Sequence, residues 1–132
     1  MSYLLDTHSF IWAVLEPRKL GPKARPVLED PNSEVVVSAV TFWEIALKAA
    51  LGKLELEGCS PESLVQAARA HGFGLLALEP QTAAGFSTLP ARLHKDPFDR
   101  MLAWQAISGR LTLVTRDRAM AVFASYGLTA LW

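Results

Sequence analysis

Two places in the chain show a short apolar run that ends in a carboxylate and is followed at once by a helical pattern. The first is the run at residues 3–5, which ends at Asp6 and precedes apolar side chains at helical spacing over 10–15. The second run, at 111–115, is followed by Asp117. An apolar run of this kind that feeds a helix is typical of a strand buried in a parallel sheet. Because ligands bind at the carboxyl ends of such strands, Asp6 and Asp117 are candidates for one site, although Asp6 is also a favoured helix N-cap.

The rest of the chain continues this alternation of strands and helices. Further strands are predicted at 35–37, 74–78 and 128–132, and a short extended piece at 54–56. Helices are predicted at about 40–51, 61–71, 80–88, 97–109 and 118–125, with a short one at 23–30 that Pro26 would disturb. This order predicts an α/β fold, a single domain over residues 1–132 with about five parallel strands flanked by helices.

Composition excludes several classes of protein. The 132 residues include 13 basic and 13 acidic side chains, so the protein has no overall positive charge that would indicate nucleic-acid binding. Binding of nucleic acid would therefore need local patches of basic residues. Cys59 is the only cysteine, which excludes an intramolecular disulfide and a cysteine-rich zinc site and fits a reducing cytoplasm. No apolar run reaches the length of a membrane span. We therefore expect a cytoplasmic protein with no membrane association.

Glu44 lies within the strongest helical pattern of the chain. The predicted apolar face of helix 40–51 carries Val40, Trp43, Leu47 and Leu51, and Glu44 falls on that same face. A buried carboxylate there would need a partner. The alternative is a surface glutamate paired with Lys48 at the i+4 position.

Two further acids lie at the start of helix 97–109. Asp96 precedes Pro97 and is the expected N-cap, because a residue before proline is pushed out of helical geometry. Asp99 lies one turn into the helix and is predicted to face the strand ends, on the same side as Leu102 and Ala106. The alternative is that both acids serve only the helix terminus.

Four acids that converge on one sheet edge need compensation, because like charges raise one another's pKa values. A divalent Mg²⁺ or Mn²⁺ ion supplies it, and such ions promote phosphodiester cleavage by activating water and stabilising the leaving oxygen. Basic residues near these acids in sequence either hold flanking phosphates or are solvated surface charges. They are Lys48, Lys95, Arg100, Arg116 and Arg118.

Four motifs together resemble those of PIN-domain nucleases, and the likeness is closest to the VapC ribonuclease toxins of type II toxin–antitoxin pairs. They are LLDTH at 4–8, VTFWEI at 40–45, HKDPFDR at 94–100 and LVTRD at 113–117. The resemblance spans nearly the whole chain and implies a sheet of order 3-2-1-4-5. It also implies a magnesium-dependent endoribonuclease that a cognate antitoxin inhibits. By motif match the metal-binding acids would be Asp6, Glu44, Asp99 and Asp117, with Thr115 supporting Asp117.

The sequence leaves some alternatives open. His8 stands where many members of that family carry asparagine, and we interpret it as a first-turn helix residue rather than a donor to the site. No Gly-x-Ser-x-Gly motif, dinucleotide fingerprint or P-loop is present. A PIN-like domain that binds RNA or protein without cutting it remains the alternative function. The aromatic side chains on helices also predict a homodimer and an apolar groove for an antitoxin segment: Trp12, Phe42, Trp43 and Trp104.

Overall fold

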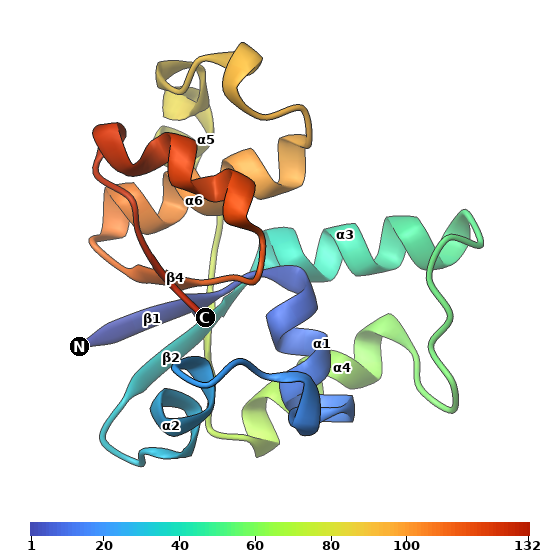
Figure 1. Cartoon of the computed structure of the whole chain (residues 1–132). Coiled ribbons are helices and arrows are strands. Elements are labelled where there is room, and N and C mark those ends of the chain that lie inside the picture. Colours follow the sequence, from blue (N-terminus) through green and yellow to red (C-terminus); the bar gives the residue numbers. More distant parts are fainter.

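A five-stranded parallel sheet lies at the centre of the computed structural model, which describes all residues from Met1 to Trp132 (Figure 1). The strand order is β3-β2-β1-β4-β5, which confirms the predicted fold class and topology. β1 is central, and its last residue, Leu5, pairs with Val37 of β2 and Val114 of β4. The strands are β1 (Ser2–Leu5), β2 (Glu34–Ser38), β3 (Gly74–Leu76), β4 (Thr112–Val114) and β5 (Thr129–Leu131).

The helices are those that the sequence predicts, with differences at their ends. They are α1 (Thr7–Leu15), α2 (Ala24–Glu29), α3 (Ala39–Ala50), α4 (Pro61–Ala70), α5 (Pro80–Gly85) and α6 (Pro97–Gly109), with 3₁₀ segments η1 (Pro17–Lys19), η2 (Phe86–Thr88), η3 (Ala91–Leu93) and η4 (Arg118–Tyr126). Pro26 is tolerated because it lies in the first turn of α2, where backbone N–H groups have no helical partner. None of the helices has the length and apolar character needed to cross a membrane.

Two predictions of secondary structure were wrong. Residues 54–56 pair with no strand and lie in the turns between α3 and α4. Segment 118–126 is a 3₁₀ helix rather than an α-helix. Its first turn is set by Asp117, whose side chain accepts a hydrogen bond from the backbone N–H of Ala119.

The two faces of the sheet bury separate apolar clusters, because side chains of a strand alternate between faces. Tyr3 and Leu5 of β1 pack with α1, α2 and α4, whereas Leu4 packs with α6 and η4. Figure 1 shows α5, α6 and η4 on one side of the sheet and α1, α2 and α4 on the other. This three-layer arrangement leaves the carboxyl ends of β1 and β4 side by side.

The buried face of α3 differs from the predicted one. Trp43, Leu47 and Leu51 are 61%, 39% and 59% exposed, whereas Glu44 is only 2% exposed. The buried residues are Val40, Thr41, Glu44 and Ile45. The predicted and the observed stripe share Val40 and Glu44 and have the same helical spacing, and α3 packs against α1, α4 and α6. Figure 1 shows the far half of α3 extending away from the sheet, and Leu47 and Leu51 in that half are exposed.

Candidate metal centre

Asp6 follows β1 directly, and the helix N-cap role considered for it is present. It is the N-cap of α1, and its Oδ1 accepts a hydrogen bond of 2.9 Å from the backbone N–H of Ser9. The Ser9 hydroxyl in turn donates to the carbonyl of Val114 at 2.9 Å, which ties α1 to the end of β4. Burial raises the pKa of Asp6 above its ordinary value, and hydrogen bonding of Ser9 and Thr115 opposes this only in part. A buried carboxylate with a raised pKa favours a cation nearby.

Asp117 follows β4 and is oriented by a short network. Its backbone N–H donates to the hydroxyl of Thr115 at 3.0 Å, and its Oδ1 accepts from the N–H of Ala119 at 2.9 Å. Its Oδ2 lies 3.0 Å from Nε2 of His94. Partial burial acts to raise the pKa of Asp117, but the hydrogen bonds from His94 and Ala119 outweigh it and hold that pKa below its usual value. Thr115 therefore supports Asp117, as its place in the motif implies.

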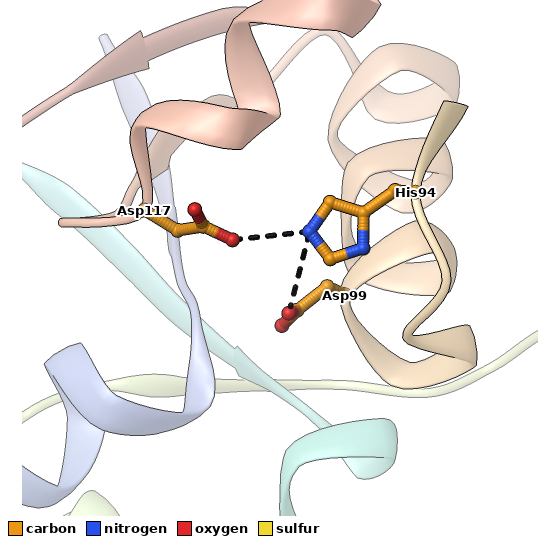
Figure 2. Close-up of side chains that lie close together, drawn as sticks. All are labelled: His94, Asp99 and Asp117. Atoms are coloured by element: carbon orange, nitrogen blue, oxygen red, sulfur yellow. Dashed lines mark hydrogen bonds and ion pairs between the residues drawn. The ribbon is translucent and has the colours of Figure 1, made fainter.

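His94 lies between two of the acids, and the sequence had not singled it out as a site residue. Figure 2 shows one ring nitrogen directed at Asp117 and at Asp99, and Nε2 lies 3.8 Å from Oδ2 of Asp99. The other ring nitrogen, Nδ1, accepts a hydrogen bond of 3.2 Å from the backbone N–H of Asp96. An accepting Nδ1 leaves the proton of the neutral ring on Nε2, so His94 donates to Asp117. The only sequence signal was a histidine just before an acid-rich helix start.

Asp99 and Asp96 have different surroundings, as the sequence predicts. Asp96 is the N-cap of α6, and its Oδ1 accepts from the N–H groups of Phe98 and Asp99 at 2.8 and 3.2 Å. Asp99 is partly buried and lies one helical turn before the buried Leu102. Burial, together with the negative charges of Asp96, Glu44 and Asp6, raises the pKa of Asp99 to about 7, and His94 acts in the opposite direction.

Glu44 reaches the same region from α3. It is buried and receives a hydrogen bond of 2.5 Å from the hydroxyl of Thr7 at the start of α1. It also forms an ion pair with Lys48 one turn later. Burial acts to lower the pKa of Lys48, but the bond to Glu44 outweighs burial and raises it. The pair expected for a surface glutamate is therefore present, but the carboxylate itself is buried and has the partner that burial requires.

Three of the four predicted acids line one cavity, and the fourth borders the next. Asp6, Asp99 and Asp117 line a cavity of about 480 Å³, whereas Glu44 lines an adjoining one of about 270 Å³. His8 is exposed and lines both. Side-chain ligand atoms of His94, Asp99 and Asp117 lie within 4.8 Å of one another. Carboxylate oxygens that share one cavity, with the pKa of Asp99 raised by burial and by the negative charges of its neighbours, fit a hard divalent cation.

The basic residues predicted near the acids fall into three groups. Arg116 and Arg118 line the cavity of the acids, and neither forms an ion pair. Lys48 is bound to Glu44, and Lys95 is exposed on the loop before α6. Arg100 is not directed at the acids as the sequence suggested: its guanidinium donates to the carbonyl of Leu89 and covers the ring of Phe86 at 4.3 Å. Arg100 does not line the cavity of the acids.

Comparisons with known proteins agree with this arrangement. The family model of the PIN domain matches residues 3–126. A protein named ribonuclease VapC22, from Mycobacterium tuberculosis, is 31% identical over 117 residues, which cover 89% of this chain and 88% of that protein. The fold is also that of VapBC2 from Rickettsia felis, solved bound to a promoter DNA fragment, with a TM-score of 0.72, 17% identity, and coverage of 100% of this chain and 99% of that one. A toxin–antitoxin complex from Klebsiella pneumoniae gives a TM-score of 0.62 at 18% identity, covering 98% and 96% of the two chains.

These likenesses extend over nearly the whole length of the chain and of its relatives. The motifs that carry the resemblance in the sequence also supply the acids that the fold brings to one edge of the sheet. The chain therefore belongs to the PIN domain family and, within it, is similar to the VapC ribonucleases.

Proposed function

We propose that this protein is a metal-dependent endoribonuclease that cleaves phosphodiester bonds in RNA, with Mg²⁺ or Mn²⁺ held by Asp6, Glu44, Asp99 and Asp117. The observation that carries the proposal is the convergence of three acids, from β1, α6 and the end of β4, on one cavity. Burial and the negative charges of neighbouring acids raise the pKa of Asp99 to about 7, and a bound cation would offset that charge. The name of the VapC22 relative supports ribonuclease activity.

Each residue of the site has a role that its contacts allow. When bound, a divalent ion activates a water molecule and stabilises the leaving oxygen. His94 donates to Oδ2 of Asp117 and so restricts the orientation of that carboxylate, as outer partners of metal ligands do. Thr7 and Lys48 hold Glu44 in the same way. Arg116 and Arg118, which have no carboxylate partner, bind the phosphates on either side of the scissile bond.

The test is cleavage of single-stranded RNA by the purified protein with Mg²⁺, with Mn²⁺ and with EDTA. Asp6→Asn should abolish cleavage without unfolding the protein, because asparagine also caps a helix well. Asp30→Asn is the matched control, since Asp30 is an exposed acid that caps a turn before the amino end of β2. Cleavage that persists in EDTA or in Asp6→Asn would contradict the proposed metal centre.

A catalytically inactive PIN-like domain that binds RNA or protein is the second candidate. It is favoured only by Lys48, which already provides Glu44 with one positive charge. In the same assay this candidate predicts RNA retained in an electrophoretic shift but never cut under any metal condition.

We also propose that a cognate antitoxin inhibits the protein and that it works as a cytoplasmic homodimer. The toxin–antitoxin complex of Klebsiella pneumoniae supports the antitoxin, and the free thiol of Cys59 fits a reducing compartment. The dimer is supported by Trp43, which is 61% exposed and stacks edge-on against Phe98 at 4.9 Å. A monomeric mass by light scattering at micromolar concentration would contradict the dimer.

A further inference from the structure

Trp12 lies in the wall of the cavity that holds the acids. It is the one apolar residue among those that line this cavity with Asp6, Asp99 and Asp117. α1 carries it six residues beyond Asp6, which is about 9 Å along the helix axis at 1.5 Å per residue. The ring is partly buried and packs against Trp132, with ring centroids 5.6 Å apart, so it is braced from behind and part of it faces the cavity.

Two cationic side chains and a histidine lie around this ring. The guanidinium of Arg116 and the ammonium of Lys19 each lie 5.9 Å from the ring centroid, and the ring of His8 lies 5.6 Å away. Arg116 is exposed and forms no ion pair, so its charge is available to a phosphate. Proteins bind unpaired nucleic acid by stacking aromatic rings on its bases and by placing positive charge against its phosphates. The indole of Trp12 and the unpaired guanidinium of Arg116 match this pattern, and they lie about one nucleotide from the carboxylate cluster.

We propose that Trp12 is a stacking platform for an unpaired RNA base next to the scissile phosphate, and that Arg116 binds the phosphate of the same nucleotide. This inference rests on the proposed ribonuclease function and adds a requirement for single-stranded substrate. Bases in a duplex are already stacked on their neighbours and cannot lie against the ring unless one is turned out. A packing role alone would need neither the cavity-facing part of the ring nor the unpaired cation beside it.

The test measures binding in the Asp6→Asn background, where RNA is not cut. A labelled single-stranded RNA of twelve nucleotides and its annealed duplex are titrated by fluorescence anisotropy in EDTA. Trp12→Ala should weaken binding of the single strand about 5- to 100-fold, because stacking on an aromatic side chain contributes that much per base. Trp12→Phe should retain most of the affinity, and the duplex should bind Trp12→Ala and the parent equally. Arg116→Ala should reduce the slope of log K against log salt by about 0.7, the value for one phosphate contact with a single strand.

Tyr126→Ala is the control, since it removes an aromatic side chain, 39% exposed, that lies outside this cavity. The proposal is overturned if Trp12→Ala binds the single strand within twofold of the parent. It is also overturned if Trp12→Phe loses as much affinity as Trp12→Ala, or if the single strand and the duplex weaken alike. Should Trp12→Ala unfold, Trp12→Leu takes its place, because leucine keeps an apolar side chain in the packing but has no ring on which a base can stack, so the same loss of single-strand affinity is expected. Cleavage of RNA by the wild-type protein is measured in a separate assay. If the wild type cleaves RNA but Trp12→Ala binds the single strand as the parent does, the stacking proposal is wrong and the ribonuclease proposal stands.

Discussion

At the scale of single residues, the acids of this site are also structural groups. Asp6, Asp96 and Asp117 each accept hydrogen bonds from backbone N–H groups at the start of a helix. Asparagine can take over these bonds but cannot supply the negative charge. Aspartate-to-asparagine substitutions therefore separate the charge that the site needs from the cap that the fold needs, which alanine substitutions do not.

The titration of Asp99 leads to a prediction for the protein without metal. Asp99 keeps its proton up to about pH 7 in the folded state but loses it near 3.8 in the unfolded chain. Between these values the folded state binds more protons, so the free energy of unfolding falls as pH rises. Asp99→Asn removes this effect, and the variant should melt higher than the wild type at pH 8 and nearer to it at pH 5. Thermal melts of both metal-free proteins at the two pH values provide the check. A difference in melting temperature between Asp99→Asn and the wild type that is smaller at pH 8 than at pH 5 would refute the raised pKa.

At the scale of an element, the start of α6 carries two acids, Asp96 and Asp99, which are three residues apart and have different contacts. Asp96 holds the N–H groups of Phe98 and Asp99, and Pro97 occupies the first helical position. Asp99 instead faces the cavity. The same helix turn therefore supplies one acid for its own stability and one for the site.

We predict that the two acids respond differently to substitution. Asp99→Asn should retain the fold yet lose nearly all metal-dependent RNA cleavage, whereas Asp96→Asn should keep most activity because asparagine caps well. Asp96→Ala should destabilise the protein by about 1 kcal/mol, the usual cost of a lost N-cap. Cleavage rates at saturating Mg²⁺, with denaturant unfolding alongside, test this. An inactive Asp96→Asn beside an active Asp99→Asn would show that the wrong acid has been assigned to the site.

At the scale of the whole molecule, the site joins elements that are far apart in the chain. The acids proposed for it follow β1, lie in α3, begin α6 and follow β4, and the sheet with the helical layers on its two faces holds them at one edge. Because these elements meet only in the folded state, repulsion between the acids lowers the free energy of unfolding of the whole domain when no cation is bound. Compensation of that charge should stabilise the fold as a unit.

We predict that Mg²⁺ raises the melting temperature of the wild type. A ligand that binds only the native state adds about 2.7 kcal/mol at a hundredfold excess over its Kd. Asp6→Asn should melt at the same or a higher temperature than the wild type in EDTA, because one buried carboxylate charge is gone, and should gain less from Mg²⁺. Asp30→Asn, which lies outside the site, should gain as much as the wild type. Equal gains in the wild type and Asp6→Asn would place the metal elsewhere.

Much of this protein followed from local sequence patterns. The apolar runs that form β1, β2 and β4 are short and continuous, and four of the six α-helices begin at a side-chain cap, namely Asp6, Ser38, Ser60 and Asp96. Strand burial and helix capping depend on neighbours in the chain, so the order of elements could be read without the fold. Because parallel strands end at one edge, the same patterns also indicated that Asp6 and Asp117 lie near each other.

The tertiary structure alone decided which of several equivalent local choices was used. Residues of α3 on two sides of Val40 and Glu44 have helical spacing, and contacts with other elements, among them α1, α4 and α6, bury Thr41 and Ile45 and leave Trp43 and Leu47 exposed. His94 bonds to Asp117, 23 residues away, and Trp12 meets Trp132 from the other end of the chain. Arg100, three residues from a helix start rich in acids, turns instead to Leu89. Such contacts depend on distances between segments remote in sequence, and no local periodicity or cap specifies those distances.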